Sequence, residues 1–220
     1  MQFRDNIPFL NQITLGDCRT LTLALPNGSI DLIFTDPPYE KKYLPLYRWL
    51  AQEAARVLKP GGFLLTYTGN TWKYEVMQYL GRYLTYFWDY IALDTGPGTI
   101  VWHRKTLARH KSILAFVKGS GKPRCNTLSV WSGSGADKKY HVWGQDESTA
   151  RYYIDCFTQP GAIIYDPFSG GGTVPVVCQQ LRRSFIAFDS NPQSVAVAKE
   201  RVHSGISPKP VSSYSLKVSQ

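Results

Sequence analysis

The groups best suited to chemistry stand in one short run, Asp36-Pro37-Pro38-Tyr39, directly after the apolar, β-branched residues 30–35. The two prolines have no N–H, so their carbonyls and the Asp36 carboxylate form a cluster that only accepts hydrogen bonds. The Tyr39 ring offers a flat surface for stacking. A planar guest with an exocyclic NH2 group fits both features. The alternative is an ordinary turn at a strand end, in which Asp36 caps the next segment.

A second group of candidate residues follows an apolar run near the other end of the chain, in Asp166-Pro-Phe-Ser-Gly-Gly-Gly-Thr173. Its glycines allow a tight turn and close approach of a ligand to the backbone, as in nucleotide sites at the carboxyl end of a parallel strand. No lysine follows them, which excludes a triphosphate-binding loop. Asp189 ends the next apolar run, where doubly wound folds place an acid that binds ribose hydroxyls. Alternatively, Asp189 caps the following helix.

These residues need elements that bring them together. Apolar runs predict strands, and apolar positions at helical spacing predict helices. The predicted strands are 12–17, 30–36, 62–67, 86–94, 112–119, 162–166 and 183–189, and the predicted helices are 47–58, 71–84, 146–161, 174–181 and 191–202. This alternation predicts an open, mostly parallel α/β sheet with helices on both faces, in which the strand pair 86–94 and 112–119 is the antiparallel exception.

Six motifs in this order resemble an S-adenosylmethionine-dependent amino-methyltransferase of nucleic acids, of the β class of DNA methyltransferases. They are GDC (16–18), DPPY (36–39), RVLKPGG (56–62), ILAFVKG (113–119), DPFSGGGT (166–173) and FIAFDSNP (185–192). The resemblance implies a Rossmann-like methyltransferase fold with a mostly parallel seven-stranded sheet, one antiparallel strand and a circularly permuted motif order. It further implies a single domain over 1–203, with a catalytic half 1–119, a short target-recognition segment 120–140 and a cofactor half 141–203. The Ser- and Pro-rich residues 204–220 are predicted to be a mobile tail.

The resemblance assigns roles residue by residue. The catalytic residues it implies are Asp36, Pro37, Pro38 and Tyr39. The residues it implies for S-adenosylmethionine are Asp17, Cys18, Asp36, Asp166, Pro167, Phe168, Ser169, Gly170, Gly172, Thr173 and Asp189. The segment 141–148 departs from the family pattern, because Val142 stands where a proline is usual and no Lys-Pro follows. The resemblance therefore leaves open which of His141, Trp143 and Gln145 contact the cofactor, and Trp143 is equally compatible with the core. For Asp17 and Cys18 the alternative is a simple turn.

The charge pattern points to nucleic acid. The formal net charge is +9, and residues 95–136 contain no Asp or Glu. Basic residues interleaved with aromatic rings attract a phosphate backbone, and counterion release then drives affinity. The candidate nucleic-acid-binding residues are Lys41, Lys42, Arg104, Lys105, Arg109, Lys122 and Arg124. The alternative is a generic solvated face.

The resulting hypothesis is a site-specific enzyme that transfers a methyl group from S-adenosylmethionine to adenine N6 of a base flipped out of double-stranded DNA. The alternatives are a cytosine N4 enzyme, an RNA adenine methyltransferase, or a non-catalytic nucleic-acid-binding subunit with the same fold. Because segment 120–140 is small for reading several base pairs, we expect modest specificity or help from the basic loop, a partner protein or a second subunit in a homodimer.

Other classes of protein are disfavoured. The four cysteines and four histidines are scattered, which predicts no metal site and no disulfide framework. No run of about 18 apolar residues occurs, and residues 1–10 lack the apolar core of a signal peptide. The sequence therefore predicts a reduced, soluble, cytoplasmic protein without membrane contact, and the resemblance places it in a prokaryote or phage.

Overall fold

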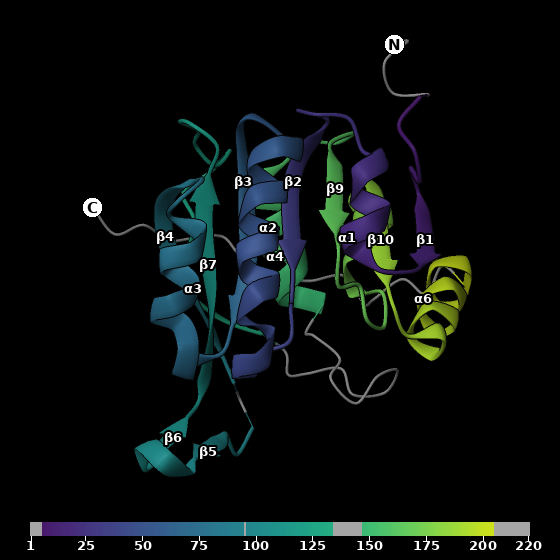
Figure 1. The fold of residues 1–220 in the computed structure, drawn as a ribbon. Helices are drawn as coiled ribbons and strands as arrows, with labels where there is room; N and C mark the ends of the chain where they lie inside the picture. The colour runs from purple at the N-terminus through teal and green to yellow at the C-terminus, as the bar shows by residue number, and fades with distance from the viewer. Residues whose placement is uncertain (1–5, 95, 134–146, 205–220) are drawn as a thin grey trace.

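The computed structural model describes residues 6–94, 96–133 and 147–204, which form a mixed sheet covered by helices (Figure 1). The strand order is β1-β10-β9-β2-β3-β7-β4-β8. The bounds are β1 (Gln12–Leu15), β2 (Ile30–Thr35), β3 (Leu58–Thr68), β4 (Thr85–Leu93), β7 (His110–Val117), β8 (Val130–Ser132), β9 (Ile163–Asp166) and β10 (Ser184–Asp189). Among the described residues this sheet therefore has eight strands, whereas seven were predicted. The added strand, β8, is three residues long and lies in a Ser-rich stretch without an apolar run, so no sequence pattern marked it.

One strand runs against the others. β7 is antiparallel to both of its neighbours, β3 and β4, while β8 is parallel to β4. The predicted antiparallel pair, 86–94 with 112–119, is confirmed as β4 and β7. Because β7 is reversed, its first residues lie at the edge of the sheet where β2, β3 and β9 end.

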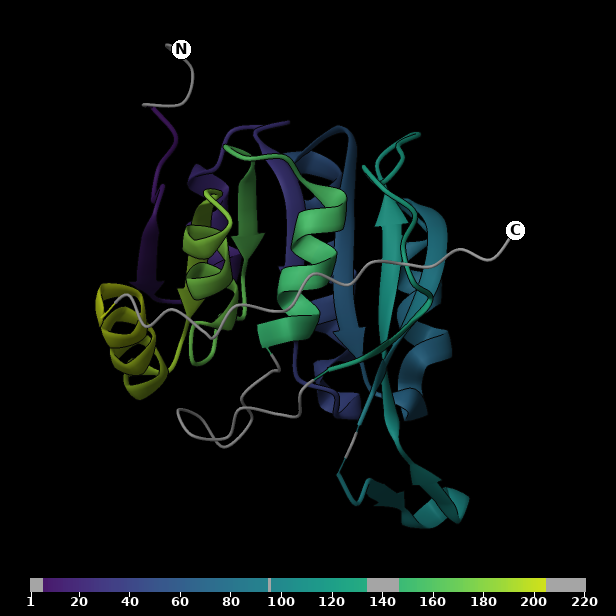
Figure 2. The same cartoon turned by 180° about the vertical axis from the view of Figure 1, so that it is seen from behind.

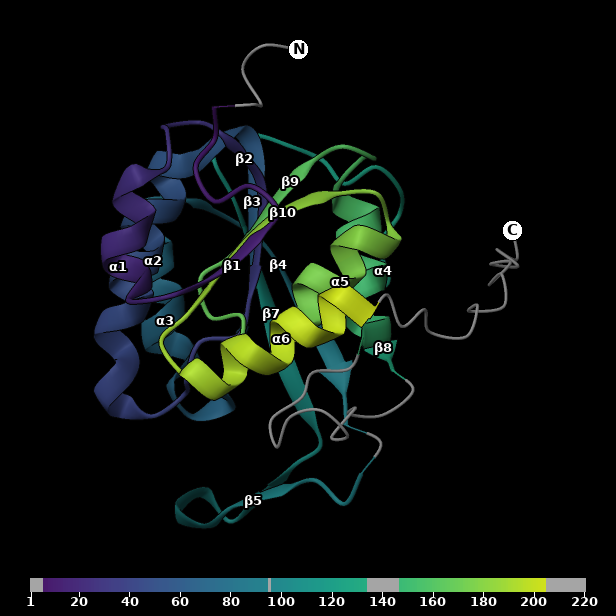
Figure 3. The same cartoon turned by 90° about the vertical axis from the view of Figure 1, so that its right-hand side faces the viewer.

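Helices cover both faces of the sheet (Figure 3). One face carries α1 (Cys18–Leu21), α2 (Leu44–Val57) and α3 (Lys73–Leu80). The other face carries α4 (Glu147–Phe157), α5 (Thr173–Gln180) and α6 (Pro192–Ser204). Short 3-10 turns occur at η1 (Thr22–Ala24), η2 (Lys41–Tyr43), η3 (Asn70–Trp72) and η4 (Trp102–Arg104). The five predicted helices are all present, several of them shorter than expected.

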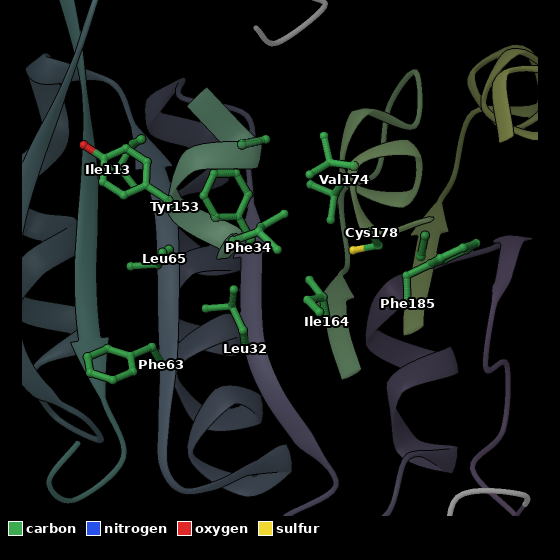
Figure 4. Packing of buried hydrophobic residues seen from close by; sticks show 14 of the residues in the cluster. Leu32, Phe34, Phe63, Leu65, Ile113, Tyr153, Ile164, Val174, Cys178 and Phe185 are labelled. Carbon is green, nitrogen blue, oxygen red and sulfur yellow. The ribbon is translucent and has the colours of Figure 1, made fainter. Parts of the chain in front are cut away.

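The core has two layers because side chains of a strand alternate between its faces. In β2, Leu32 and Phe34 point to the α4–α6 side, where Figure 4 shows them near Tyr153 and Val174. Ile33 lies in the opposite layer, with residues of α2 such as Leu50. All of these side chains are almost fully buried. A strand buried on both faces is typical of the centre of a parallel sheet, and it fixes the point at which Asp36 emerges.

A hairpin arm projects from the sheet (Figure 2). It consists of β5 (Thr99–Val101), the η4 turn and β6 (Thr106–Ala108), with β5 and β6 paired antiparallel. The arm joins β4 to β7, so it leaves the sheet at the edge where the parallel strands end (Figure 1). The sequence marked this region only as a basic stretch.

Candidate active site

The motif-bearing strands β2 and β9 are neighbours in the sheet, with Leu32 paired to Ile164 and Ile33 to Tyr165. From β9 the chain continues through α5 to β10 on one side, and from β2 through α2 to β3 on the other. Ligands of open α/β sheets bind at such a switch in strand order, beyond the carboxyl ends of the strands. The hydroxyl of Thr35 donates to Asp166 Oδ1 at 2.7 Å and links the two strand ends. The structure thus brings together the two motifs that the sequence singled out.

The carboxylate of Asp36 has one hydrogen-bond donor and one ion-pair partner from the protein. The Tyr39 hydroxyl donates to Oδ1, and Lys111 Nζ lies 3.9 Å from Oδ2. The same ammonium group lies 5.3 Å from the centre of the Tyr39 ring, within cation–π range. Lys111 arrives from the start of the reversed strand β7. An incoming amine therefore has to replace contacts that the protein makes with itself.

Tyr39 packs closely against Gly69, the residue that follows β3. A Cβ added to Gly69 would lie 2.9 Å from Tyr39 Cβ, closer than real Cβ atoms approach, and 3.2 Å from its Cγ. Burial raises the pKa of the Tyr39 phenol, and the Asp36 charge raises it further. Tyr39 is therefore neutral, and it contributes a ring and a hydroxyl donor.

Asp166 differs from Asp36 in its environment. Its carboxyl group is buried, and burial raises its pKa from 3.8 to about 7. Hydrogen bonds from Thr35 and from the Phe168 N–H, the latter at 3.1 Å, oppose this shift, while the charges of Asp189 and Asp36 add to it. A buried acid beside two other carboxylates favours a cationic neighbour.

The glycine loop is closed by Asp189. Its two carboxylate oxygens accept hydrogen bonds from the backbone N–H groups of Gly170 and Asn191, each at 2.8 Å. A carboxylate has further acceptor sites, so Asp189 keeps capacity for hydroxyl donors. Ser169 Oγ is buried and has no hydrogen-bond partner among the described residues. Gly170 has a φ of +49°, and a Cβ added to it would meet no atom within 4 Å. In the part of the chain that the structure describes, the loop therefore has a buried hydroxyl without a partner at Ser169 and open space at Gly170, two features expected of a ligand site.

Gly172 serves a different purpose from Gly170. Its φ is +80°, and an added Cβ would lie 2.7 Å from the Cβ and 2.9 Å from the Cα of Ala198 in α6. Arg201, also in α6, donates to the carbonyl of Gly171 and forms an ion pair with Glu147 of α4. Gly172 thus permits close packing of the loop on α6, and Arg201 holds the loop there.

The other predicted cofactor residues lie near this edge. The backbone N–H of Gly16 donates to the Asp189 carbonyl at 2.9 Å, which places Asp17 and Cys18 close to β10. Asp17 caps α1 and forms an ion pair with Arg19 at 2.6 Å, whereas the Cys18 thiol is buried and its pKa is raised to about 12 by burial. Of the remaining predicted residues, Pro167 and Phe168 directly follow β9, and Thr173 is the first residue of α5.

The predicted nucleic-acid-binding residues do not form one surface. Lys41 and Lys42 follow the DPPY run, and Arg104, Lys105 and Arg109 are exposed on or beside the arm. Lys122 and Arg124 come after the end of β7, at the opposite edge of the sheet. The Arg124 guanidinium donates to the carbonyls of Asp155 and Thr158 at the end of α4. The structure therefore separates Lys122 and Arg124 from the other five.

Sequence reasoning missed several residues of the site, notably Lys111, Gly69 and Trp49. The Trp49 ring meets Phe168 edge to face at 6.3 Å. Lys111 belongs to the basic stretch, but nothing in the sequence specifies the pairing of Ser112 with Thr68 that brings it beside Asp36. Gly69 directly follows β3, and its position at a strand end was the available signal.

Several predictions from the sequence concern residues that the structure does not describe, and others concern metal sites and membrane spans. His141, Trp143, Gln145, the recognition residues 134–140 and the tail 205–220 lie outside the described residues. Within the described ranges, no three His, Cys, Asp or Glu side chains are grouped as metal ligands would be. In the same ranges, no helix is long and apolar enough to cross a membrane.

Comparison with known proteins gives matches to DNA methyltransferases. Residues 101–200 match a family model described as DNA methylase. The Type II methyltransferase M.HpaI of Haemophilus parainfluenzae is 29% identical over 85% of this chain and 73% of its own length. M.BamHI of Bacillus amyloliquefaciens is 28% identical over 88% of this chain, which spans only 57% of that protein. The family model and both relatives are thus DNA methyltransferases to which this chain is similar.

Solved structures share the fold. PvuII DNA methyltransferase, described as cytosine-N4-specific, superposes with a TM-score of 0.76 at 19% identity, over 86% of this chain and 85% of its own. M1.HpyAVI, solved with SAM, gives a TM-score of 0.72 at 24% identity, over 87% and 98% of the two chains. The mostly parallel mixed sheet is therefore that of known DNA methyltransferases.

Proposed function

We propose that this protein transfers a methyl group from S-adenosylmethionine to the exocyclic N6 of adenine in double-stranded DNA. One observation carries the proposal: the acceptor-only end of β2 lies beside the glycine loop of β9, at the switch in strand order. The end of β2 suits an amine, and the glycine loop after β9 suits a cationic nucleoside. Their adjacency matches a reaction that joins the two.

The glycine loop fits the cofactor. Asp166, with its raised pKa, and the nearby Asp36 and Asp189 carboxylates favour a cation, and the open space at Gly170 leaves room for a ligand. Asp189 has acceptor capacity for ribose hydroxyls. When bound, S-adenosylmethionine supplies a methyl group activated by its sulfonium.

The residues at the end of β2 act on the acceptor amine. Hydrogen bonds from the NH2 group to the Asp36 carboxylate and to the Pro37 carbonyl favour a pyramidal nitrogen and stabilise the positive charge that develops on it. Asp36 need not remove a proton before attack. Holding the acceptor amine and the methyl donor together at the carboxyl ends of β2 and β9 supplies much of the remaining acceleration. Oriented reactions reach effective molarities of about 10⁵ M and above.

The acceptor base has to enter a site in which the Tyr39 hydroxyl and the Lys111 ammonium group already lie beside Asp36. We infer that the Tyr39 hydroxyl leaves Asp36 as the base stacks on the Tyr39 ring, and that Lys111 moves away from Oδ2. A duplex base reaches this site only by leaving the stack, at a cost of a few kcal/mol. The Tyr39 ring offsets part of that cost.

The arm supplies the proposed contact with DNA. It projects at the site edge with exposed Arg104 and Lys105 at its tip, and the Trp102 side chain there is 79% exposed. Lys41 and Lys42 add positive charge at the same edge. This distribution suits phosphate contacts on either side of an extruded base.

Cytosine N4 is the second candidate acceptor. It is favoured by the fold shared with the cytosine-N4-specific PvuII enzyme. Against it, enzymes of this kind that act on cytosine more often carry Ser where this chain has Asp36. RNA adenine and a non-catalytic DNA-binding subunit are further alternatives.

The decisive experiment is incubation of the protein with methyl-labelled S-adenosylmethionine and unmodified DNA or RNA of varied sequence, followed by nucleoside analysis. We expect labelled N6-methyladenine from DNA and none with Asp36→Ala, with Lys199→Ala on α6 as a control of unchanged activity. Label in N4-methylcytosine or in RNA identifies the corresponding alternative. Cofactor binding without any transfer indicates a non-catalytic subunit.

We also propose a homodimer, because the segment assigned to target recognition is short. Sedimentation at varied protein concentration tests this. A monomer that retains full activity at low nanomolar concentration contradicts it.

A further inference from the structure

We propose that Cys125 and Cys156 form an oxidisable thiol pair, at which a small disulfide crosslinks the segment before β8 to α4. The Cys125 thiol donates to Cys156 Sγ, and the two sulfurs are 3.0 Å apart. A disulfide bond is about 2.05 Å long, so the sulfurs need to approach by only about 1 Å. The cysteine spacing in the sequence gave no sign of this pair.

The backbone on both sides of the pair is fixed. The N–H of Arg124 donates to the Cys156 carbonyl at 2.8 Å, and its guanidinium donates to the Thr158 carbonyl at 2.8 Å. Further along, the Tyr152 hydroxyl accepts from the Leu128 N–H at 2.7 Å. The segment therefore crosses α4 in one position, and the contact between the sulfurs is part of that docking.

The two thiols differ in access. Cys125 is exposed, whereas Cys156 is buried. Burial, together with the neighbouring Cys125, raises the pKa of the Cys156 thiol to about 12. Reagents in solution therefore reach Cys125 first, and Cys156 acts second, as the resolving thiol.

The chemistry is a thiol–disulfide exchange in two steps. The Cys125 thiolate attacks one sulfur of the small disulfide, and a mixed disulfide forms as the first small thiolate leaves. Cys156, on losing its proton, attacks Cys125 Sγ, and the second small thiolate leaves. The two protons pass to the leaving thiolates, so two protein thiols are oxidised and one small disulfide is reduced to two thiols.

The crosslink fixes the start of the segment that the resemblance assigns to target recognition. Only this consequence rests on the proposed function, because the exchange itself can be measured without methyl transfer. The cysteines Cys18 and Cys178 are buried in the two core layers and provide an internal comparison.

The test is incubation of the folded full-length protein with oxidised glutathione, followed by denaturation, blocking of free thiols and peptide mapping by mass spectrometry. We expect a Cys125–Cys156 crosslinked peptide, with Cys18 and Cys178 blocked as free thiols. The melting temperature should rise by about 5–10 °C and return on reduction, as for a disulfide that closes a loop of about 30 residues in a chain of this size.

Two variants separate the steps. Cys156→Ser should keep glutathione on Cys125 as a stable adduct, and Cys125→Ser should take up no glutathione while folded. Four free thiols in the treated wild-type protein, or a lasting glutathione adduct on wild-type Cys125, would overturn the proposal. Reaction of Cys18 or Cys178 at the same rate as Cys125 would overturn the assigned order of access.

Discussion

Asp36 and Asp166 lie at the carboxyl ends of two neighbouring strands, but their environments differ. Asp36 is partly exposed and has Lys111 and the Tyr39 hydroxyl beside it, whereas Asp166 is buried and has a pKa raised to about 7. Two carboxyl groups in such different environments are suited to different roles in a reaction. Asp36 suits a developing positive charge on an amine, and Asp166 suits a cation that is present throughout.

The raised pKa of Asp166 predicts that cofactor affinity depends on pH. Below about 7 the carboxyl group is protonated, and binding of the cationic cofactor has to ionise it. Affinity for S-adenosylmethionine should therefore increase as pH rises from 5.5 to 7, by up to about tenfold per pH unit, and then level off. Calorimetric titration at several pH values measures this, and Asp166→Asn should bind weakly with no such slope. A wild-type affinity that is constant over this range contradicts the prediction.

The Tyr39 hydroxyl and ring have separable roles. The hydroxyl competes with the acceptor amine for Asp36, whereas the ring stacks on the base. Tyr39→Phe should therefore keep kcat/KM for DNA within about threefold of wild type, while Tyr39→Ala should lower it at least about fivefold, since base stacking contributes about 1–3 kcal/mol. Steady-state methylation kinetics measure both. A Phe variant as impaired as the Ala variant would show that the hydroxyl takes part in the reaction.

At the scale of the elements, the sequence predicted what depends on local patterning. Buried apolar runs predicted the central strands, and helical spacing predicted α2 and α4, because each pattern follows from which side of the element is buried. Register between distant strands has no such local signal, so the approach of Lys111 to Asp36 was not predicted. Neither was β8, whose three residues gain their strand geometry by pairing with β4. The motif-bearing residues were found where they follow β2, β9 and β10, whereas Lys111 was missed because the register of β7 brings it in.

The two glycines predicted for the cofactor should respond differently to substitution. Gly172→Ala places a Cβ against the backbone of α6 at a φ of +80°, so it should lower the free energy of unfolding by about 2 kcal/mol or more. Gly170→Ala meets open space at a φ of +49° and should cost only about 1 kcal/mol of stability, while cofactor affinity falls at least about tenfold because the methyl group occupies the ligand's space.

Urea unfolding and cofactor titration of the same two variants separate these effects. Equal losses of stability would contradict the distinction between a packing glycine and a ligand glycine. A Gly170→Ala variant with wild-type cofactor affinity would place the ligand elsewhere.

For the whole molecule, the direction of the strands divides the basic residues into two groups. The arm and Lys41 lie at the edge where the parallel strands end, together with Asp36, and Lys122 and Arg124 lie at the other edge. A duplex that presents a base to Asp36 contacts the first group. Net charge alone does not separate the arm from Lys122 and Arg124, because all of these residues belong to the same acid-free stretch of sequence.

Salt dependence of DNA binding tests this division. The double variant Arg104→Gln/Lys105→Gln should reduce the slope of log affinity against log salt by about 1.8, because each lost phosphate contact removes about 0.9. The matched control Lys122→Gln/Lys199→Gln removes the same charge from exposed positions away from the site edge and should change the slope by less than about 0.5. Fluorescence anisotropy with a labelled duplex at several salt concentrations measures both slopes. If the control variant loses more slope than the arm variant, DNA lies along the opposite edge, and the proposed delivery of a base to Asp36 by the arm is wrong.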